Sequence, residues 1–343
     1  WTMGSRILGF VRDILMAGTL GAGLIADAFF VAFKFPNFFR RLFAEGAFNA
    51  AFVPLFGERL TTEGKASARA FAAEAAAVLV SALMLFTFSA VLLMPWLMYA
   101  IAPGFADQPE KFGLTIELTR ITFPYLMFMA LIALLGGMLN TMQRFAATAA
   151  APILLNIVLI SALVLIGLGY IPHPGFGLAW AVTAAGIGQL IWIAAACARA
   201  DIMIRLPRPR LTPSVRRLLA LMAPGLIGAG VVQINLVVDV ILASTLREGS
   251  VSYLYFADRI NQLPLGVVGV AVGVALLPLL TRQLADGDEA AASDSQNRAI
   301  EFALILTLPA AAALVTIAGP IVSVLFERGA FDAAAAANTA AAL

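Results

Sequence analysis

Charged side chains interrupt several long apolar stretches of this sequence, and they are the residues best placed to do chemistry there. The basic ones are Arg6, Arg12, Lys34, Arg40, Arg41, Arg120 and Arg259, and the acidic ones are Asp13, Asp27, Glu45, Glu117, Asp239 and Asp258. Inside a bilayer a charged side chain costs about 2.5–3.5 kcal/mol on insertion scales, so each has to pair, reach the headgroups or line water. Spacing favours the pairs Arg6 with Asp13 and Asp27 with Lys34, because residues seven apart share a helical face.

Basic residues outnumber acidic ones over the first two apolar stretches. A water-filled cavity with an excess of positive charge attracts an anion, and the rigid fork of a guanidinium binds phosphate through two hydrogen bonds, which a lysine cannot copy. The candidate binding residues are therefore Arg6, Arg12, Arg40 and Arg259, and the candidate ligand is a diphosphate carried by a lipid. An exporter of organic cations would need a cavity of the opposite charge.

The composition indicates that these residues belong to a membrane protein. Of the 343 residues, 62% are hydrophobic and only 12% are charged, whereas soluble domains are near half apolar and a quarter charged. The apolar runs reach roughly 20 residues, which is long enough to cross about 30 Å of hydrocarbon as helices. The predicted fold class is therefore an all-α, polytopic membrane protein.

The apolar runs predict about nine to ten spans. They lie near residues 2–20, 25–57, 70–102, 112–141, 146–169, 176–198, 216–246, 250–281 and 297–326, and the last begins near 332. The chain starts without Met and ends within an alanine-rich run. We therefore expect a longer protein that is truncated here after those spans.

The distribution of basic residues predicts the orientation. Connections after even-numbered spans carry most of them, above all the segment 199–217, with Arg199, Arg205, Arg208, Arg210, Arg216 and Arg217. Connections after odd-numbered spans carry Lys111, Arg247 and Arg328. The positive-inside rule then places the N-terminus in the cytoplasm. The basic segment is expected to contact anionic lipid rather than nucleic acid.

An internal repeat predicts two lobes. Residues 13–23 match residues 239–249, with identical residues at Asp13, Ala17, Thr19, Leu20 and Gly23. The copies lie six predicted spans apart and so share one orientation, as in transporters built from parallel six-helix repeats. The predicted organisation is an N-terminal lobe at 1–200, a basic cytoplasmic linker at 201–217 and a partial C-terminal lobe at 218–343.

Several motifs resemble those of the MurJ (MviN) lipid II flippase family, within the multidrug/oligosaccharidyl-lipid/polysaccharide exporter superfamily. They are SRILGFVRD at 5–13, ADAFFVAFKFPN at 26–37, RRLFAEGAF at 40–48 and AFVP at 51–54, continued by segments at 102–105, 179–182, 255–259 and 269–273. The resemblance covers essentially the whole chain. It implies a two-lobe exporter fold whose alternating access moves lipid II, the undecaprenyl-diphosphate precursor of peptidoglycan, outward across the bacterial cytoplasmic membrane.

The resemblance also implies which residues bind. By motif, Arg6, Arg12, Arg40 and Arg259 correspond to arginines that line the family's central cavity, and Asp27, Lys34 and Glu45 match its other charged positions. Asp239 is a candidate sodium ligand, with Gln233 and Asn235 before it, and sodium is the only candidate cofactor. The other reading of these polar residues is a hydrogen-bonded cluster between helices, the role also expected of Asn156 and Gln189.

The implied protein is a transporter and not an enzyme. We expect a monomeric, multi-pass inner-membrane protein of peptidoglycan biosynthesis, and thus of cell-wall and cell-shape formation, with lipid II and the bilayer as partners and no nucleic acid. The alternative is a flippase of the same superfamily for O-antigen or exopolysaccharide repeats, which would share the cationic cavity but not the motifs at 5–13 and 26–48. A transferase or phosphatase would need a nucleophile or metal-binding acids at the membrane face, and a channel or scaffold would not depend on particular arginines.

Overall fold

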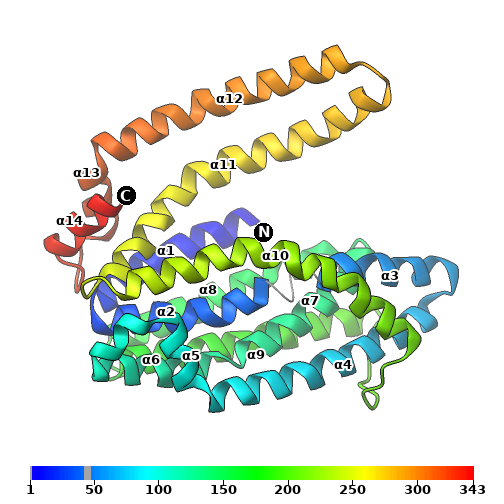
Figure 1. Ribbon diagram of the computed structural model, residues 1–343, viewed down its shortest axis with the longest axis horizontal. Helices are drawn as coiled ribbons and strands as arrows, with labels where there is room; N and C mark the ends of the chain where they lie inside the picture. Colours follow the sequence, from blue (N-terminus) through cyan, green and yellow to red (C-terminus); the bar gives the residue numbers. More distant parts are fainter. Residues whose placement is uncertain (1, 42–47) are drawn as a thin grey trace. The chain divides into compact units, whose positions relative to one another are not determined.

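The computed structural model describes residues 2–41 and 48–343, and nearly all of them are helical (Figure 1). The helices are α1 (Thr2–Leu20), α2 (Leu24–Phe39), α3 (Asn49–Thr62), α4 (Lys65–Leu92), α5 (Met94–Ile101), the short 3₁₀ helix η2 (Pro103–Asp107), α6 (Pro109–Thr122), α7 (Tyr125–Thr141), α8 (Phe145–Gly167), α9 (Pro174–Arg199), α10 (Pro213–Ser244), α11 (Ser250–Ala285), α12 (Glu289–Thr316), α13 (Ala318–Phe326) and α14 (Ala333–Ala342). The all-α class is confirmed.

Prolines divide some of the apolar runs into two helices. The run at 70–102 forms α4 and α5, which separate at Leu93 just before Pro95, and the run at 112–141 forms α6 and α7, which separate at Phe123 and Pro124. Proline has no backbone N–H and its ring clashes with the preceding turn, so a helix ends or bends there. The run at 70–102 is therefore a pair of helices, whereas α6 and α7 together still make one candidate membrane-crossing segment, Pro109–Thr141.

Several helices are long and apolar enough to cross a membrane. Within the described residues there are five such segments, namely Lys65–Leu92, Pro109–Thr141, Phe145–Gly167, Pro174–Arg199 and Glu289–Thr316. The two halves of α10, Pro213–Gly228 and Gln233–Ser244, are bent by 48° and together make a sixth candidate. These helices identify a multi-pass membrane protein, and the larger total of about nine to ten spans stays a prediction.

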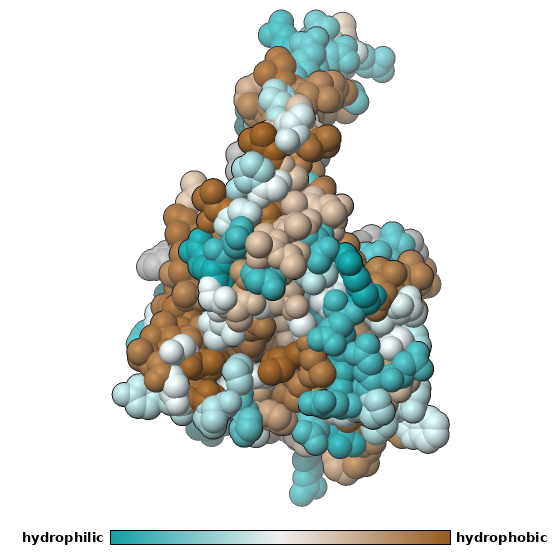
Figure 2. Space-filling model, turned by 90° about the vertical axis from the view of Figure 1, so that its left-hand side faces the viewer, coloured by the Kyte–Doolittle hydropathy of each residue, from teal (hydrophilic) through white to brown (hydrophobic). Residues whose placement is uncertain are grey.

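Large hydrophobic side chains are exposed on the outside of these helices. They include Leu85 and Phe88 on α4, Trp96 on α5, and Trp180 and Ile191 on α9. Figure 2 shows broad hydrophobic areas beside hydrophilic ones on the face that it presents. Continuous apolar surface of this kind is rare on soluble monomers, and it fits helices whose outer faces meet lipid.

Residues Trp1–Val251 form one compact unit. In it α8 packs on both α1 and α9, α2 packs on α6, and α7 packs on α9 and α3. The core includes a run of stacked rings, in which Phe52 lies 5.6 Å from Phe56 and 5.7 Å from Phe71 between centroids. Gln189 on α9 donates to the carbonyl of Ala151 on α8 at 2.8 Å, which confirms its expected role in joining helices.

Residues Ser252–Leu343 form a second compact unit. The chain runs along α11, reverses at residues 286–288 and returns along α12 (Figure 1). Its buried centre is a cluster of three rings, with Phe256 5.0 Å from Phe326 and 5.2 Å from Phe331. The predicted linker at 201–217 is a boundary between two lobes that move relative to each other in transport. A division of the chain into compact units does not test such a boundary, so the linker stays a prediction.

Candidate functional site

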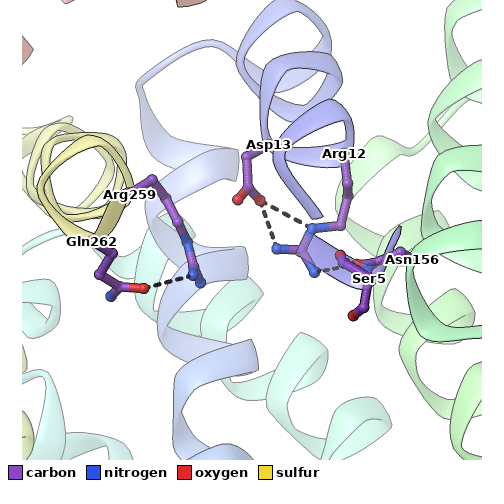
Figure 3. Close-up of polar contacts among 6 residues, drawn as sticks. All are labelled: Ser5, Arg12, Asp13, Asn156, Arg259 and Gln262. Atoms are coloured by element: carbon purple, nitrogen blue, oxygen red, sulfur yellow. Dashed lines mark hydrogen bonds and ion pairs between the residues drawn. The ribbon is translucent and has the colours of Figure 1, made fainter. Parts of the chain in front are cut away.

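Arg12 on α1 lies in a buried polar cluster (Figure 3). Its Nε and Nη2 donate to Oδ1 of Asp13 at 3.0 and 2.7 Å, and its Nη1 donates to Oδ1 of Asn156 on α8 at 3.0 Å. Arg12 is 7% exposed and Asp13 3%. Burial of a charge is tolerated only with such pairing, so the fork of the guanidinium is fixed in direction by two neighbours.

The sequence of α1 explains why α8 can approach this cluster. Ser5, Gly9 and Arg12 are spaced so that they share one helical face. A Cβ at Gly9 would lie 3.7 Å from the side chain of Asn156, an ordinary van der Waals distance, so this face of α1 lies directly against Asn156. Asn156 also donates to the carbonyl of Ser5 at 3.0 Å, and its predicted role between helices is confirmed.

A second buried ion pair joins α2 to α6. Nζ of Lys111 lies 2.7 Å from Oδ2 of Asp27, and these residues are 2% and 1% exposed. The ammonium also lies 4.1 Å from the centre of the Phe105 ring. The placement of Lys111 in a connecting segment is wrong, because α6 already begins at Pro109. A proline at the first helical position is a start signal that could have revealed this.

The connection between α10 and α11 is held against the same region. The backbone N–H of Gly249 donates to Oδ2 of Asp27 at 2.8 Å, and Oε1 of Glu248 accepts from the backbone N–H of Leu24 at 2.9 Å. Gly104 in η2 donates to Oγ of Ser244 at 3.3 Å. Asp27 therefore links three parts of the chain that are far apart in sequence, a role that its helical spacing with Lys34 did not indicate.

The close approach at Gly104 predicts a stability effect. A Cβ there would lie 2.2 Å from the carbonyl oxygen of Ser244 and 2.6 Å from Cα of Thr245, which are backbone atoms that cannot rotate away. Gly104→Ala should therefore lower the free energy of unfolding by about 1–3 kcal/mol, as overpacking does, measured by thermal unfolding of the purified protein. Gly113→Ala, where no atom lies within 4 Å of the new Cβ, is the matched control. Equal unfolding temperatures for both variants would contradict the close contact.

The other predicted binding residues are dispersed over the helices. Arg6 is exposed near the start of α1, and Lys34 is half-buried on α2. Arg40 follows the end of α2 and donates from Nε to Oδ1 of Asn37 at 2.9 Å. Glu45 lies outside the described residues. The structure thus brings Arg12 together with Asp13, and Asp27 together with Lys111.

Arg259 belongs to the second unit, on α11. Its Nη1 donates to Oε1 of Gln262 at 3.3 Å (Figure 3), and its guanidinium carbon lies 4.8 Å from the centre of the Tyr255 ring. The stacking on an aromatic face is a geometry that arginine favours and lysine does not share in the same way. Both contacts come from residues one turn away on α11, and together they fix the direction of the guanidinium.

The candidate sodium ligand is exposed. Asp239 lies on α10, as do the exposed Asn235 and the buried Gln233. Within residues 2–41 and 48–343, no group of three or more His, Cys, Asp or Glu side chains could hold a metal ion. Asp239 alone would supply one carboxylate to such a site, so sodium binding there stays a prediction.

Two hollows in the described part of the chain lie along residues 203–212. One, of about 290 Å³, is lined by Arg69 and Arg205, and the other, of about 340 Å³, by Glu74, Arg208 and Arg210 among others. Neither is lined by the predicted binding arginines. The arginine-lined central cavity therefore stays a prediction.

A family model described as "Lipid II flippase MurJ" matches residues 16–343. The chain is 53% identical over 335 residues to the probable lipid II flippase MurJ of Rhizobium tropici, a match that covers 97% of this chain and 63% of that protein. The chain thus spans somewhat less than two thirds of the length of that relative.

Solved structures agree with the sequence match. The structure of a lipid II flippase MurJ in an inward closed conformation is 28% identical with a TM-score of 0.81, covering 99% of this chain and 69% of that one. An inward-facing multidrug resistance MATE family transporter of the MOP superfamily, 16% identical, shares the fold with a TM-score of 0.71 and covers 98% of this chain and 76% of that one. The exporter fold is confirmed. Because the family model matches nearly the whole chain, the chain belongs to the MurJ lipid II flippase family.

Proposed function

We propose that the protein moves lipid II outward across the bacterial cytoplasmic membrane by alternating access, with an arginine-lined cavity that binds the diphosphate. It is a multi-pass, monomeric transporter with a cytoplasmic N-terminus, it catalyses no chemical reaction, and it serves peptidoglycan synthesis. Its candidate substrate contacts are Arg6, Arg12, Lys34, Arg40 and Arg259, with Asp27 and Glu45 as charged neighbours. A sodium ion at Asp239 is part of the same proposal.

The observation that carries this function is the guanidinium of Arg12, held inside the protein by Asp13 and Asn156. A buried arginine on a predicted membrane span marks a functional site by default, because it is costly to retain. Guanidinium binds phosphate oxygens through paired, charge-assisted hydrogen bonds. The family of the chain and the chemistry of this residue therefore point to the same ligand, a lipid diphosphate.

Asp13 has a definite part in this mechanism. Its carboxylate occupies two N–H groups of Arg12, at 3.0 and 2.7 Å, in the arrangement that a phosphate oxygen would take. A diphosphate has to compete with that carboxylate, so Asp13 keeps the site neutral without substrate and weakens binding enough for release. A transporter needs both, since a site that binds too tightly does not turn over.

Contacts around Asp27 close one side of the pathway. Gly249 on Asp27, Glu248 on Leu24 and Ser244 on Gly104 join the α10–α11 connection to α2 and η2. By the distribution of basic residues this is the outer side. Opening outward then requires these hydrogen bonds to break, and opening inward leaves them intact.

The test is translocation by the full-length protein in proteoliposomes that contain fluorescent lipid II, followed by quenching of the outer leaflet. We expect protein-dependent movement that a short-chain polyprenyl diphosphate inhibits and a cationic dye does not. Protein-free vesicles are the control. Inhibition by the dye alone would contradict an anion-binding pathway, because a net-cationic cavity repels organic cations.

The same vesicle assay distinguishes a lipid II flippase from the alternative, a flippase for O-antigen or exopolysaccharide repeats. A lipid-linked O-antigen repeat carries the same diphosphate but a different saccharide, so it should compete weakly if the protein also recognises the saccharide-peptide. Faster movement of the O-antigen lipid than of lipid II would favour the alternative. Release of phosphate or saccharide from either lipid would contradict the assignment as a transporter.

A further inference from the structure

The segment 202–212, which connects α9 to α10, is extended and lies against α4. Ile202 is fully buried, and the carbonyl of Met203 accepts from Nη2 of Arg69 at 3.0 Å. At its other end Oγ1 of Thr212 donates to Oε2 of Glu74 at 2.8 Å. The segment is thus fixed on α4 at both of its ends, and hollows between it and α4 form a groove.

The groove contains the two hollows and is flanked by arginines. Arg69 and Arg205 face the first, of about 290 Å³, together with small side chains of α4 such as Ala66 and Ala70. Arg208 and Arg210 face the second, of about 340 Å³. The small side chains lie on α4 beside Arg69, and the other arginines lie on the segment 202–212, which leaves space between them for a ligand of headgroup size.

The charge of the groove is available to a ligand. Arg205, Arg208 and Arg210 are exposed and make no hydrogen bond or ion pair with the residues that the structure describes. Glu74 accepts from the neutral hydroxyl of Thr212 and keeps its charge, which offsets one of the two arginines of the second hollow and leaves the other in excess. The groove therefore has positive charge that the protein itself does not neutralise.

Apolar side chains alternate with these arginines. Met203, Leu206 and Leu211 are exposed on the same segment. The segment directly follows α9 and lies near the beginning of α4, and both helices are long and apolar enough to span the membrane. A basic and apolar segment at the end of membrane helices is in the position of the headgroups and the first acyl carbons.

We propose that this groove binds an anionic phospholipid of the cytoplasmic leaflet. Arg69 and Arg205 hold the phosphate, Arg208 and Arg210 add to the positive potential that attracts it, and Leu206 contacts an acyl chain. The bound lipid is a resident ligand and is not transported. The inference rests on the proposed membrane orientation but not on the identity of the transported substrate.

Native mass spectrometry of the full-length protein in detergent tests the proposal, with phosphatidylglycerol and phosphatidylethanolamine as probes. The wild-type protein should bind phosphatidylglycerol more tightly than phosphatidylethanolamine. Arg205→Gln should weaken the binding of phosphatidylglycerol about fivefold, which is the contribution of one basic residue near an anionic headgroup. Arg208→Gln combined with Arg205→Gln should weaken it about 25-fold. Arg144→Gln, another exposed arginine in a connecting segment, is the matched control and should bind as the wild type does.

Each other outcome overturns the proposal. Equal binding of both lipids, or equal binding by Arg205→Gln and Arg144→Gln, would remove the groove as a phosphate site. Displacement of phosphatidylglycerol by a smaller amount of lipid II would assign the groove to the substrate. Since Arg205 makes no contact that holds the fold together, its replacement leaves the Arg69–Met203 hydrogen bond in place. This experiment measures lipid binding and not translocation. A negative result in the translocation assay would therefore contradict the flippase assignment without affecting this proposal.

Discussion

Lys111→Met is expected to lower the free energy of unfolding by about 3–5 kcal/mol, the usual cost of removing one partner of a buried ion pair. The ammonium lies 2.7 Å from the carboxylate of Asp27, which is 1% exposed and gains no water when the charge opposite it is lost. Methionine has a similar length, so packing changes little. Thermal and denaturant unfolding of the purified protein in detergent measure the loss.

A matched exposed pair and a double variant make this prediction sharp. Lys65 lies 3.2 Å from Asp201, with side-chain exposures of 39% and 85%, and Lys65→Met should cost about 0–1 kcal/mol because solvent screens the pair. Asp27→Asn added to Lys111→Met should restore part of the stability, since it removes the buried charge. Similar losses for the two single lysine variants would show that Asp27 is not held in a buried pair.

Arg12→Ala should reduce lipid II translocation by about two orders of magnitude, since charge-assisted hydrogen bonds contribute about 1.5–3 kcal/mol each. Arg12→Lys should be nearly as inactive. The guanidinium contacts Asp13 through two nitrogens and Asn156 through a third, and a single ammonium cannot reproduce this fork. Initial rates in proteoliposomes, normalised to inserted protein, measure both effects.

Arg120→Lys is the control for this experiment. Arg120 is exposed on α6 and its Nε donates to the carbonyl of Val91 at 3.1 Å, so we expect nearly unchanged transport. Full activity of Arg12→Lys would mean that charge suffices and geometry does not matter. Full activity of Arg12→Ala, with normal insertion, would exclude Arg12 from the transport pathway.

The elements could be predicted closely from hydropathy and helix signals. The expected spans at 2–20, 146–169 and 176–198 agree within two residues with α1, α8 and α9. Hydropathy did not reveal the breaks within 70–102 and 112–141, because apolar residues continue across them. Only the backbone effect of Pro95 and Pro124 separates those helices.

The candidate site was predictable in residue type but not in partners. Arg12 and Asp27 stand out as charges in apolar runs, and both are buried as such charges must be. Besides Asp13, which adjoins Arg12, their contacts come from residues far along the chain, such as Asn156 and Lys111, and helical spacing reports only neighbours on the same helix. Lys111 in particular is assigned to a connecting segment because the predicted apolar span begins only after it, at residue 112.

Helix α10 is fastened at both of its ends. At its beginning Thr212 bonds to Glu74 and Ser214 accepts from Arg59, and at its end Ser244 bonds to Gly104. A rod that is anchored twice cannot slide lengthwise or rotate about its axis without first breaking an anchor. Its remaining freedom is curvature, and its two halves already meet at 48°. A change of the angle between its two halves is therefore the motion of α10 that leaves the hydrogen bonds at both ends intact.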